Sequence, residues 1–89
     1  MPTVTFTSAL QRFLAAPSAE VEAATVGEAL GRVFASNPAL RGYVLDEHGA
    51  VRHHVAVFVD GTAIADKRNP TQALGERSEV YVMQALSGG

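Results

Sequence analysis

Residues 55–61 read Val-Ala-Val-Phe-Val-Asp-Gly. Side chains alternate between the two faces of a strand, so the valines at 55, 57 and 59 share one face and Phe58 lies on the other. The Asp60-Gly61 pair that comes next is typical of a tight hairpin turn, because glycine adopts positive φ without steric cost. The sequence therefore predicts a strand from His53 to Val59 and a short return strand over 62–64.

An amphipathic helix is predicted to begin after Thr25. Thr25 and Glu28 have the spacing of a capping box, in which each side chain accepts from an unpaired backbone amide near the helix start. Pro38 ends the helix, since the residue before a proline is driven out of the α region. The apolar positions recur every three or four residues and form one stripe: Val26, Ala29, Leu30, Val33 and Phe34.

Three further segments alternate or break in recognisable ways. Residues 3–7 and 19–23 alternate apolar with polar side chains and predict an N-terminal β-hairpin. Residues 79–83, Glu-Val-Tyr-Val-Met, predict the last strand. Residues 71–74 suggest a single helical turn, and residues 39–52 carry turn signals without a predicted element.

The predicted order is ββαββ with a short extra strand. This is an α+β fold in which a mixed sheet of four to five strands packs on one main helix. The predicted core consists of Val4, Phe6, Val21, Leu30, Val33, Phe34, Val55, Val57, Val59, Leu74, Val80 and Val82.

Composition limits the function. Eighty-nine residues with 47% hydrophobic and 18% charged side chains predict one small folded domain. A net charge of −2 gives no basic excess for nucleic acid, and no apolar run reaches membrane-spanning length. The absence of cysteine excludes disulfides, thiolate metal sites and cysteine nucleophiles. We expect a cytoplasmic protein that binds neither nucleic acid nor membrane.

Three local patterns resemble the ubiquitin-like β-grasp superfamily, and within it the ThiS/MoaD-like sulfur carriers. They are the helix opening at 25–30, the strand and turn at 55–61, and the strand at 79–83 followed by small residues ending in Gly88-Gly89. The resemblance covers the whole chain and is nearest to the carrier that serves cysteine synthesis. Residues 76–78, Glu-Arg-Ser, depart from the Asp-Gly-Asp common in the family. The implied organisation is a β-grasp domain over 1–86 and a flexible diglycine tail over 87–89.

The resemblance implies a function that depends on the tail. Gly89 is expected to supply a carboxylate that an E1-like adenylating enzyme of the MoeB/ThiF type activates with ATP and that becomes a thiocarboxylate. Gly88 has no Cβ and gives the tail access to a narrow active site. The implied partners also include a sulfur-accepting synthase and a tail-processing metalloprotease. The chain itself is expected to bind no cofactor or metal and to be a protein co-substrate rather than an enzyme.

An apolar docking surface is predicted on the outward face of the sheet. If the valines of the last two long strands point inward, Phe58, Tyr81 and Met83 point outward near the tail, and Leu86, just before the tail, is a further predicted docking residue. Covering loop residues such as Tyr43, or self-association, are the alternatives. His53 and His54 are adjacent on the predicted strand and should point to opposite faces, which is unsuitable for a shared metal ion.

Two other functions fit the same sequence. A ubiquitin-like protein modifier would use the same activated Gly89 carboxylate to form an isopeptide bond with a target lysine. An interaction module without catalysis would have the fold but no use for the diglycine.

Overall fold

The computed structural model describes residues 1–7 and 18–84. Within these ranges the chain forms five strands and two helices. In chain order they are β1 (Thr3–Phe6), β2 (Ser18–Glu20), α2 (Val26–Ser36), α3 (Pro38–Val44), β3 (Val55–Val59), β4 (Thr62–Ala63) and β5 (Glu79–Gln84). The predicted α+β class and the β-grasp arrangement are confirmed.

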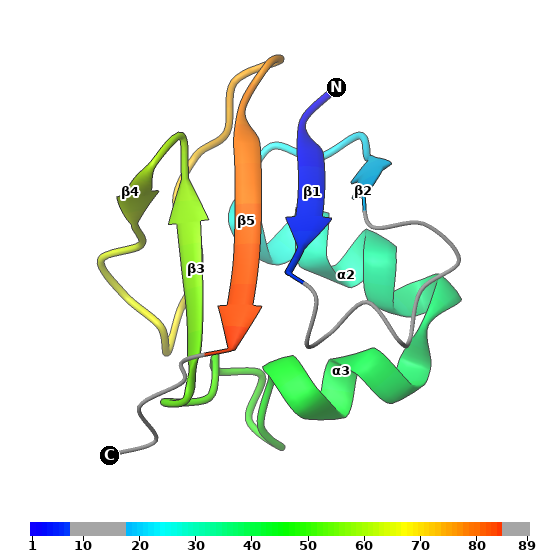
Figure 1. The fold of residues 1–89 in the computed structure, drawn as a ribbon, viewed down its shortest axis with the longest axis vertical. Helices are drawn as coiled ribbons and strands as arrows, with labels where there is room; N and C mark the ends of the chain where they lie inside the picture. The colour runs from blue at the N-terminus through cyan, green and yellow to red at the C-terminus, as the bar shows by residue number, and fades with distance from the viewer. Residues whose placement is uncertain (8–17, 85–89) are drawn as a thin grey trace.

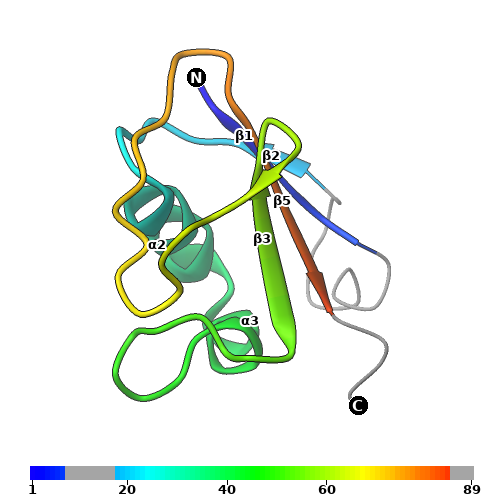
Figure 2. The same ribbon diagram turned by 90° about the vertical axis from the view of Figure 1, so that its left-hand side faces the viewer.

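The strands form one mixed sheet in the order β2-β1-β5-β3-β4 (Figure 1). The central pair, β1 and β5, is parallel, and the other pairs are antiparallel. Both helices lie on the same side of the sheet, as the side view in Figure 2 shows. The opposite face, here called the open face, is therefore covered by neither helix.

The core lies between the sheet and the two helices. Alternate side chains of β1, β3 and β5 are buried there, together with the apolar stripe of α2. Ten of the twelve predicted core residues are buried, and Val21 and Leu74 are only partly buried against the cluster. Val21 lies just beyond the end of β2, an edge strand with fewer neighbours to cover it.

The start of α2 confirms the predicted cap, with one difference. The Glu28 amide donates to Thr25 Oγ1 at 3.2 Å, as predicted. The Glu28 carboxylate, however, accepts from the amide of Ala24 at 2.8 Å, one residue before the N-cap. Both bonds satisfy amides that the helix itself cannot pair.

The helix α3 was not predicted. Pro38 ends α2 as expected, but it also occupies the first turn of α3, where its missing amide costs nothing. Leu40 and Val44 are one turn apart and both are fully buried. The pattern is short and contains Gly42, which obscures its period.

The predicted helical turn at 71–74 was wrong. Ala73 forms an isolated antiparallel bridge with Thr25. The amide of Val26 donates to the Gln72 carbonyl at 3.0 Å, and the amide of Leu74 donates to the Ala24 carbonyl at 2.8 Å. The segment is therefore extended and pairs with the entry to α2.

The predicted hairpin turn is confirmed. Asp60 and Gly61 have φ angles of 50° and 87°, the conformation that a two-residue hairpin turn with positive φ at both positions requires. Asp60 Oδ1 also accepts from the Glu79 amide at 2.9 Å, which ties the hairpin to the first residue of β5.

The burial of α3 gives a stability prediction. Leu40→Ala removes a fully buried side chain and should lower the free energy of unfolding by about 2–4 kcal/mol. Urea denaturation followed by circular dichroism measures it. Arg41→Ala, at an exposed position of the same helix, is the matched control and should change stability by less than about 0.5 kcal/mol. Equal effects of the two substitutions would contradict the packing described for α3.

Candidate functional site

The open face of the sheet carries an aromatic pair at its centre. Tyr81 of β5 lies directly opposite Phe58 of β3 in the strand register. Tyr81 is 40% exposed and Phe58 is half-buried, whereas their chain neighbours Val80, Val82 and Val57 are buried on the helix side. The alternation inferred from the sequence is thus present in both strands.

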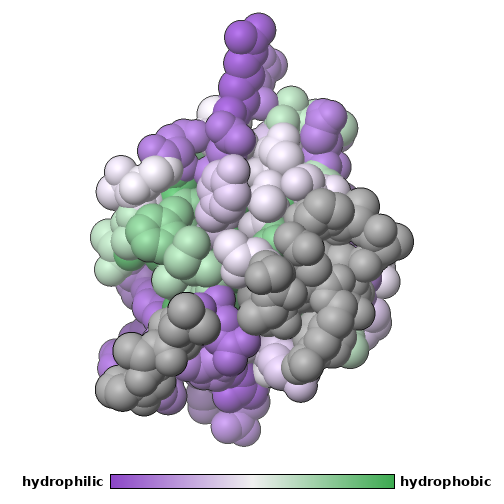
Figure 3. All heavy atoms as spheres, in the orientation of Figure 1, coloured by the Kyte–Doolittle hydropathy of each residue, from purple (hydrophilic) through white to green (hydrophobic). Residues whose placement is uncertain are grey.

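A second apolar pair lies next to the first, toward the end of β5. Met83 is opposite Ala56, and both side chains are half-buried. Figure 3 shows hydrophobic side chains gathered over β3 and the neighbouring part of the sheet. We call Ala56, Phe58, Tyr81 and Met83 the open-face patch. The structure brings together three of the predicted docking residues, Phe58, Tyr81 and Met83.

The other half of the open face is hydroxyl-rich. Thr5 of β1 is opposite Tyr81 on one side and Ser18 of β2 on the other. The Thr5 and Ser18 hydroxyl oxygens are 3.0 Å apart and share a hydrogen bond. The face is therefore apolar over β3 and β5 and polar over β1 and β2, which limits the area that an apolar partner surface can cover.

The remaining predicted site residues lie outside the described residues. These are Leu86, Gly88 and Gly89, together with the predicted domain boundary after residue 86. Strand β5 ends at Gln84, so five residues follow it to Gly89. Fully extended, five residues span at most about 17 Å.

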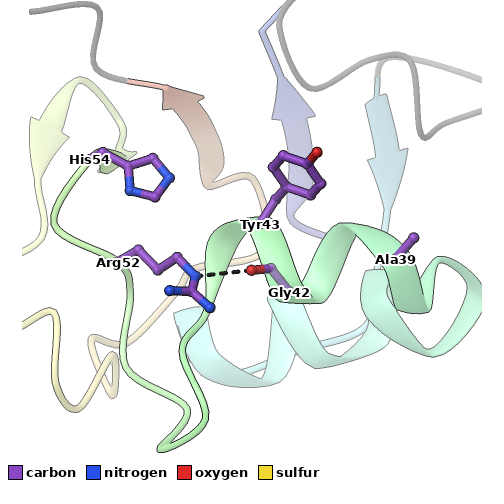
Figure 4. A pocket seen from close by; sticks show the side chains of 5 residues that line it. All are labelled: Ala39, Gly42, Tyr43, Arg52 and His54. Carbon is purple, nitrogen blue, oxygen red and sulfur yellow. Dashed lines mark hydrogen bonds between the residues drawn. The ribbon is translucent and has the colours of Figure 1, made fainter. Parts of the chain in front are cut away.

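A pocket of about 350 Å³, not identified from the sequence, lies at the end of the sheet where β5 leaves it. Its lining comes from α3 and from the segment that leads into β3: Ala39, Gly42, Tyr43, Arg52 and His54. Figure 4 shows His54 and Tyr43 on either side, with Arg52 reaching toward Gly42. The sequence signal was hidden because α3, which supplies three of these residues, was not predicted.

The histidines next to this pocket do not lie on a strand as predicted. His53 and His54 occupy a turn before β3, and their rings meet edge to face with centroids 5.7 Å apart. Among residues 1–7 and 18–84, no group of three His, Asp or Glu side chains is placed to hold a metal ion. None of the helices in these ranges is long and apolar enough to cross a membrane.

One carboxyl group near the pocket has a shifted pKa. Asp46 Oδ1 accepts from the amides of Ala50 at 3.0 Å and His48 at 2.8 Å, and these bonds hold the pKa of Asp46 below its ordinary value. The charges of His48 and Arg52 lower this pKa further. The turn bonds made by Asp46 are therefore present at neutral pH and weaken only as the pH falls through this lowered pKa.

Comparison with known proteins places the fold. No family model matches the chain, and no curated protein matches it in sequence. Solved structures do match: SAMP1 of Haloferax volcanii aligns with a TM-score of 0.83 and 25% identity over 99% of this chain and 98% of that one. This chain has the ubiquitin-like β-grasp fold.

Two further β-grasp structures agree with this assignment. A chain of the Amycolatopsis orientalis BexX/CysO complex aligns with a TM-score of 0.86 and 18% identity over the whole of both chains. Urm1 of Sulfolobus solfataricus aligns with a TM-score of 0.74 and 14% identity over 93% of this chain and 99% of that one. The resemblance inferred from the sequence is confirmed at the level of the fold.

The two faces of β3 predict opposite outcomes for the same substitution. Phe58→Asp places a carboxylate on the open face and should leave the protein folded, at a cost of about 1–2 kcal/mol for the lost cross-strand contact. Val57→Asp buries the same carboxylate without a partner and should prevent folding. Circular dichroism and amide NMR spectra report both results. A folded Val57→Asp protein, or an unfolded Phe58→Asp protein, would contradict the assignment of faces.

Proposed function

We propose that this β-grasp protein is a sulfur carrier and that the carboxylate of Gly89, as the last residue of the mature chain, is its reacting group. An E1-like adenylating enzyme activates this carboxylate, and the resulting thiocarboxylate donates sulfur in the biosynthesis of a cofactor or metabolite. The protein is a co-substrate that is loaded and unloaded by its partners.

The observation that carries the proposal is the position of β5. This strand holds Tyr81 and Met83 of the open-face patch, and the same chain segment continues toward Gly88-Gly89. A partner that covers the patch is therefore within about 17 Å of the chain end by the reach of five extended residues. Gly89, the proposed reacting group, is only five residues beyond the end of the strand that carries part of the open-face patch.

The chemistry needs only the carboxylate from this chain. A carboxylate oxygen attacks the α-phosphate of ATP, pyrophosphate leaves, and an acyl-adenylate forms. Hydrosulfide (HS⁻), from a sulfur donor at the same oxidation level, then attacks the carbonyl carbon. The bond to AMP breaks, a proton is released, and the thiocarboxylate remains. ATP is bound by the activating enzyme, and this chain supplies the acyl group.

The glycines explain how a buried active site reaches the carbonyl carbon. Residues without a Cβ pass through a channel too narrow for other side chains, and they adopt extended or positive-φ geometry at little cost. A displacement of about 1 Å of the reacting carbon can reduce the rate on the order of a hundredfold. A side chain at Gly88 is therefore expected to slow activation far more than it weakens binding.

Two partners are required by this scheme, and a third is needed only if the tail is trimmed. The adenylating enzyme loads the tail, and a sulfur-accepting synthase unloads it. A metalloprotease that trims the tail would expose Gly89 if the chain were made with residues beyond it. The open-face patch would dock each of them in turn, and Met83 suits several surfaces because its side chain is flexible and polarisable.

A second function, protein modification, is favoured by one comparison. The 25% identity to SAMP1 of H. volcanii, whose name in a related structure is small archaeal modifier protein 1, extends over nearly the whole of both chains. A modifier shares the adenylation step and differs in the final nucleophile, which is a lysine amine in place of a sulfur donor. The two functions therefore use the same tail and the same open-face patch.

Gly88→Val tests the proposal directly. With the adenylating enzyme of the source organism, the substitution should lower kcat/KM for activation about a hundredfold, because the branched side chain misplaces the carboxylate. ATP–pyrophosphate exchange measures the rate. Deletion of Gly88-Gly89 should abolish exchange while direct binding to the enzyme persists through the open-face patch.

Each result separates the candidate functions. Wild-type exchange that is lost on deletion supports a carrier or a modifier, and supplying sulfide or a lysine-containing target then tells them apart. A wild-type chain that binds the enzyme but is never adenylated would contradict the proposal and favour the interaction module.

A further inference from the structure

Arg52 lies at the end of the sheet where β5 ends, and two hydrogen bonds hold it there. Its backbone amide donates to the Val44 carbonyl at 2.9 Å, and its Nε donates to the Gly42 carbonyl at 2.9 Å. The first bond fixes the backbone, and the second holds the side chain against the last turn of α3. The guanidinium group is thereby kept at a fixed position on the wall of the pocket seen in Figure 4.

The two terminal nitrogens of this guanidinium remain available. Arginine presents five N–H donors in a planar fork, and Nε uses one of them. Within the part of the chain that the structure describes, the Nε bond is the only hydrogen bond of the Arg52 guanidinium, and it forms no ion pair. A carboxylate that accepts from both terminal nitrogens would form a bidentate, charge-assisted pair with Arg52.

The side of the pocket formed by α3 leaves room for such a carboxylate. Gly42 and Tyr43 follow Ala39 by three and four residues, so both lie next to Ala39 on the surface of α3. A Cβ built at Gly42 meets nothing within 4 Å, so the space beside Arg52 is open. A pocket of about 350 Å³ admits one acidic side chain.

The local charge also favours an anion, although the whole chain carries a net charge of −2. Arg52 lines the pocket, and the Lys67 ammonium donates to the neighbouring His53 carbonyl at 3.2 Å. Asp46, whose pKa the Arg52 charge helps to lower, is held within its own turn, where one of its oxygens accepts from two backbone amides. At the other end of the sheet Asp60 and Glu79 are exposed.

The pocket also lies close to the end of β5, from which the chain continues toward Gly89. Val55, one residue after His54, is paired with Gln84, the last residue of β5. A protein that takes the following five residues into its active site must cover this end of the sheet. We propose that the pocket lined by Arg52, His54 and α3 binds an Asp or Glu side chain of the activating partner and so orients the tail toward its active site. This inference rests on the proposed function.

Arg52 could instead serve only to hold α3, through its bond to Gly42. The two roles separate in measurement, because a structural role lowers stability without a specific effect on the partner. Arg52→Gln removes the charge, and Arg41→Gln, at an exposed position of α3, is the matched control. Gly42→Glu fills the pocket with a carboxylate of this chain's own, and Gly42→Ala is its control.

The test is the KM for each variant in ATP–pyrophosphate exchange with the adenylating enzyme, beside its melting temperature. Loss of a charge-assisted bidentate bond should raise KM about tenfold for Arg52→Gln, with kcat nearly unchanged. Gly42→Glu should raise KM similarly, while Arg41→Gln and Gly42→Ala should match the wild type. The rise in KM for Arg52→Gln should also shrink in high salt, which screens the wild-type contact.

The possible outcomes are distinct. An unchanged KM for both Arg52→Gln and Gly42→Glu overturns the proposal, and a lowered melting temperature alone leaves Arg52 a structural role. A KM that falls in Arg52→Gln also overturns it, because the Arg52 charge then opposes binding of the partner. No exchange by the wild-type chain refutes the proposed function together with this inference, whereas wild-type exchange with equal KM values refutes the pocket alone.

Discussion

The parallel pairing of β1 with β5 is the constraint on which the rest of the structure depends. It places the last strand in the middle of the sheet, between β1 and β3, so both edges of β5 are hydrogen-bonded. With its register fixed on both sides, Val80 and Val82 must face the helices, and Tyr81 and Met83 must face outward. A one-residue slip would exchange the core and the open face.

In the proposed function, the sheet and helices provide recognition, and Gly89 provides the reacting carboxylate. The sheet and helices hold the open-face patch and the Arg52 pocket at fixed positions, and both lie near the point where the chain continues toward Gly89. The proposed chemistry then needs only a carboxylate from this protein, because ATP and the sulfur donor are bound by others. A small domain can serve such a reaction by recognition and reach alone.

Strict periodicity in the sequence predicted most of the fold. The strands β1, β3 and β5, the helix α2 and the Asp60-Gly61 turn all show two- or 3.6-residue patterns or clear turn chemistry. The open-face pair Phe58 and Tyr81 was predicted from the same alternation once the strands were taken as neighbours. The elements that were missed are short or depend on tertiary contacts. The seven residues of α3 show one apolar pair, and residues 71–74 are extended because they bond to the entry of α2. The Arg52 pocket could not be predicted without α3.

Sulfur carriage by Gly89, as proposed above, can be measured directly because the chain contains no cysteine. The protein, purified from its own host, is treated with a thiol-reactive alkylating probe, and mass spectrometry locates the label. A terminal thiocarboxylate is then the group with thiol-like reactivity, so the account predicts a probe attached at Gly89. An unlabelled chain whose Gly89 is joined to lysines of other proteins would contradict sulfur carriage and identify a modifier.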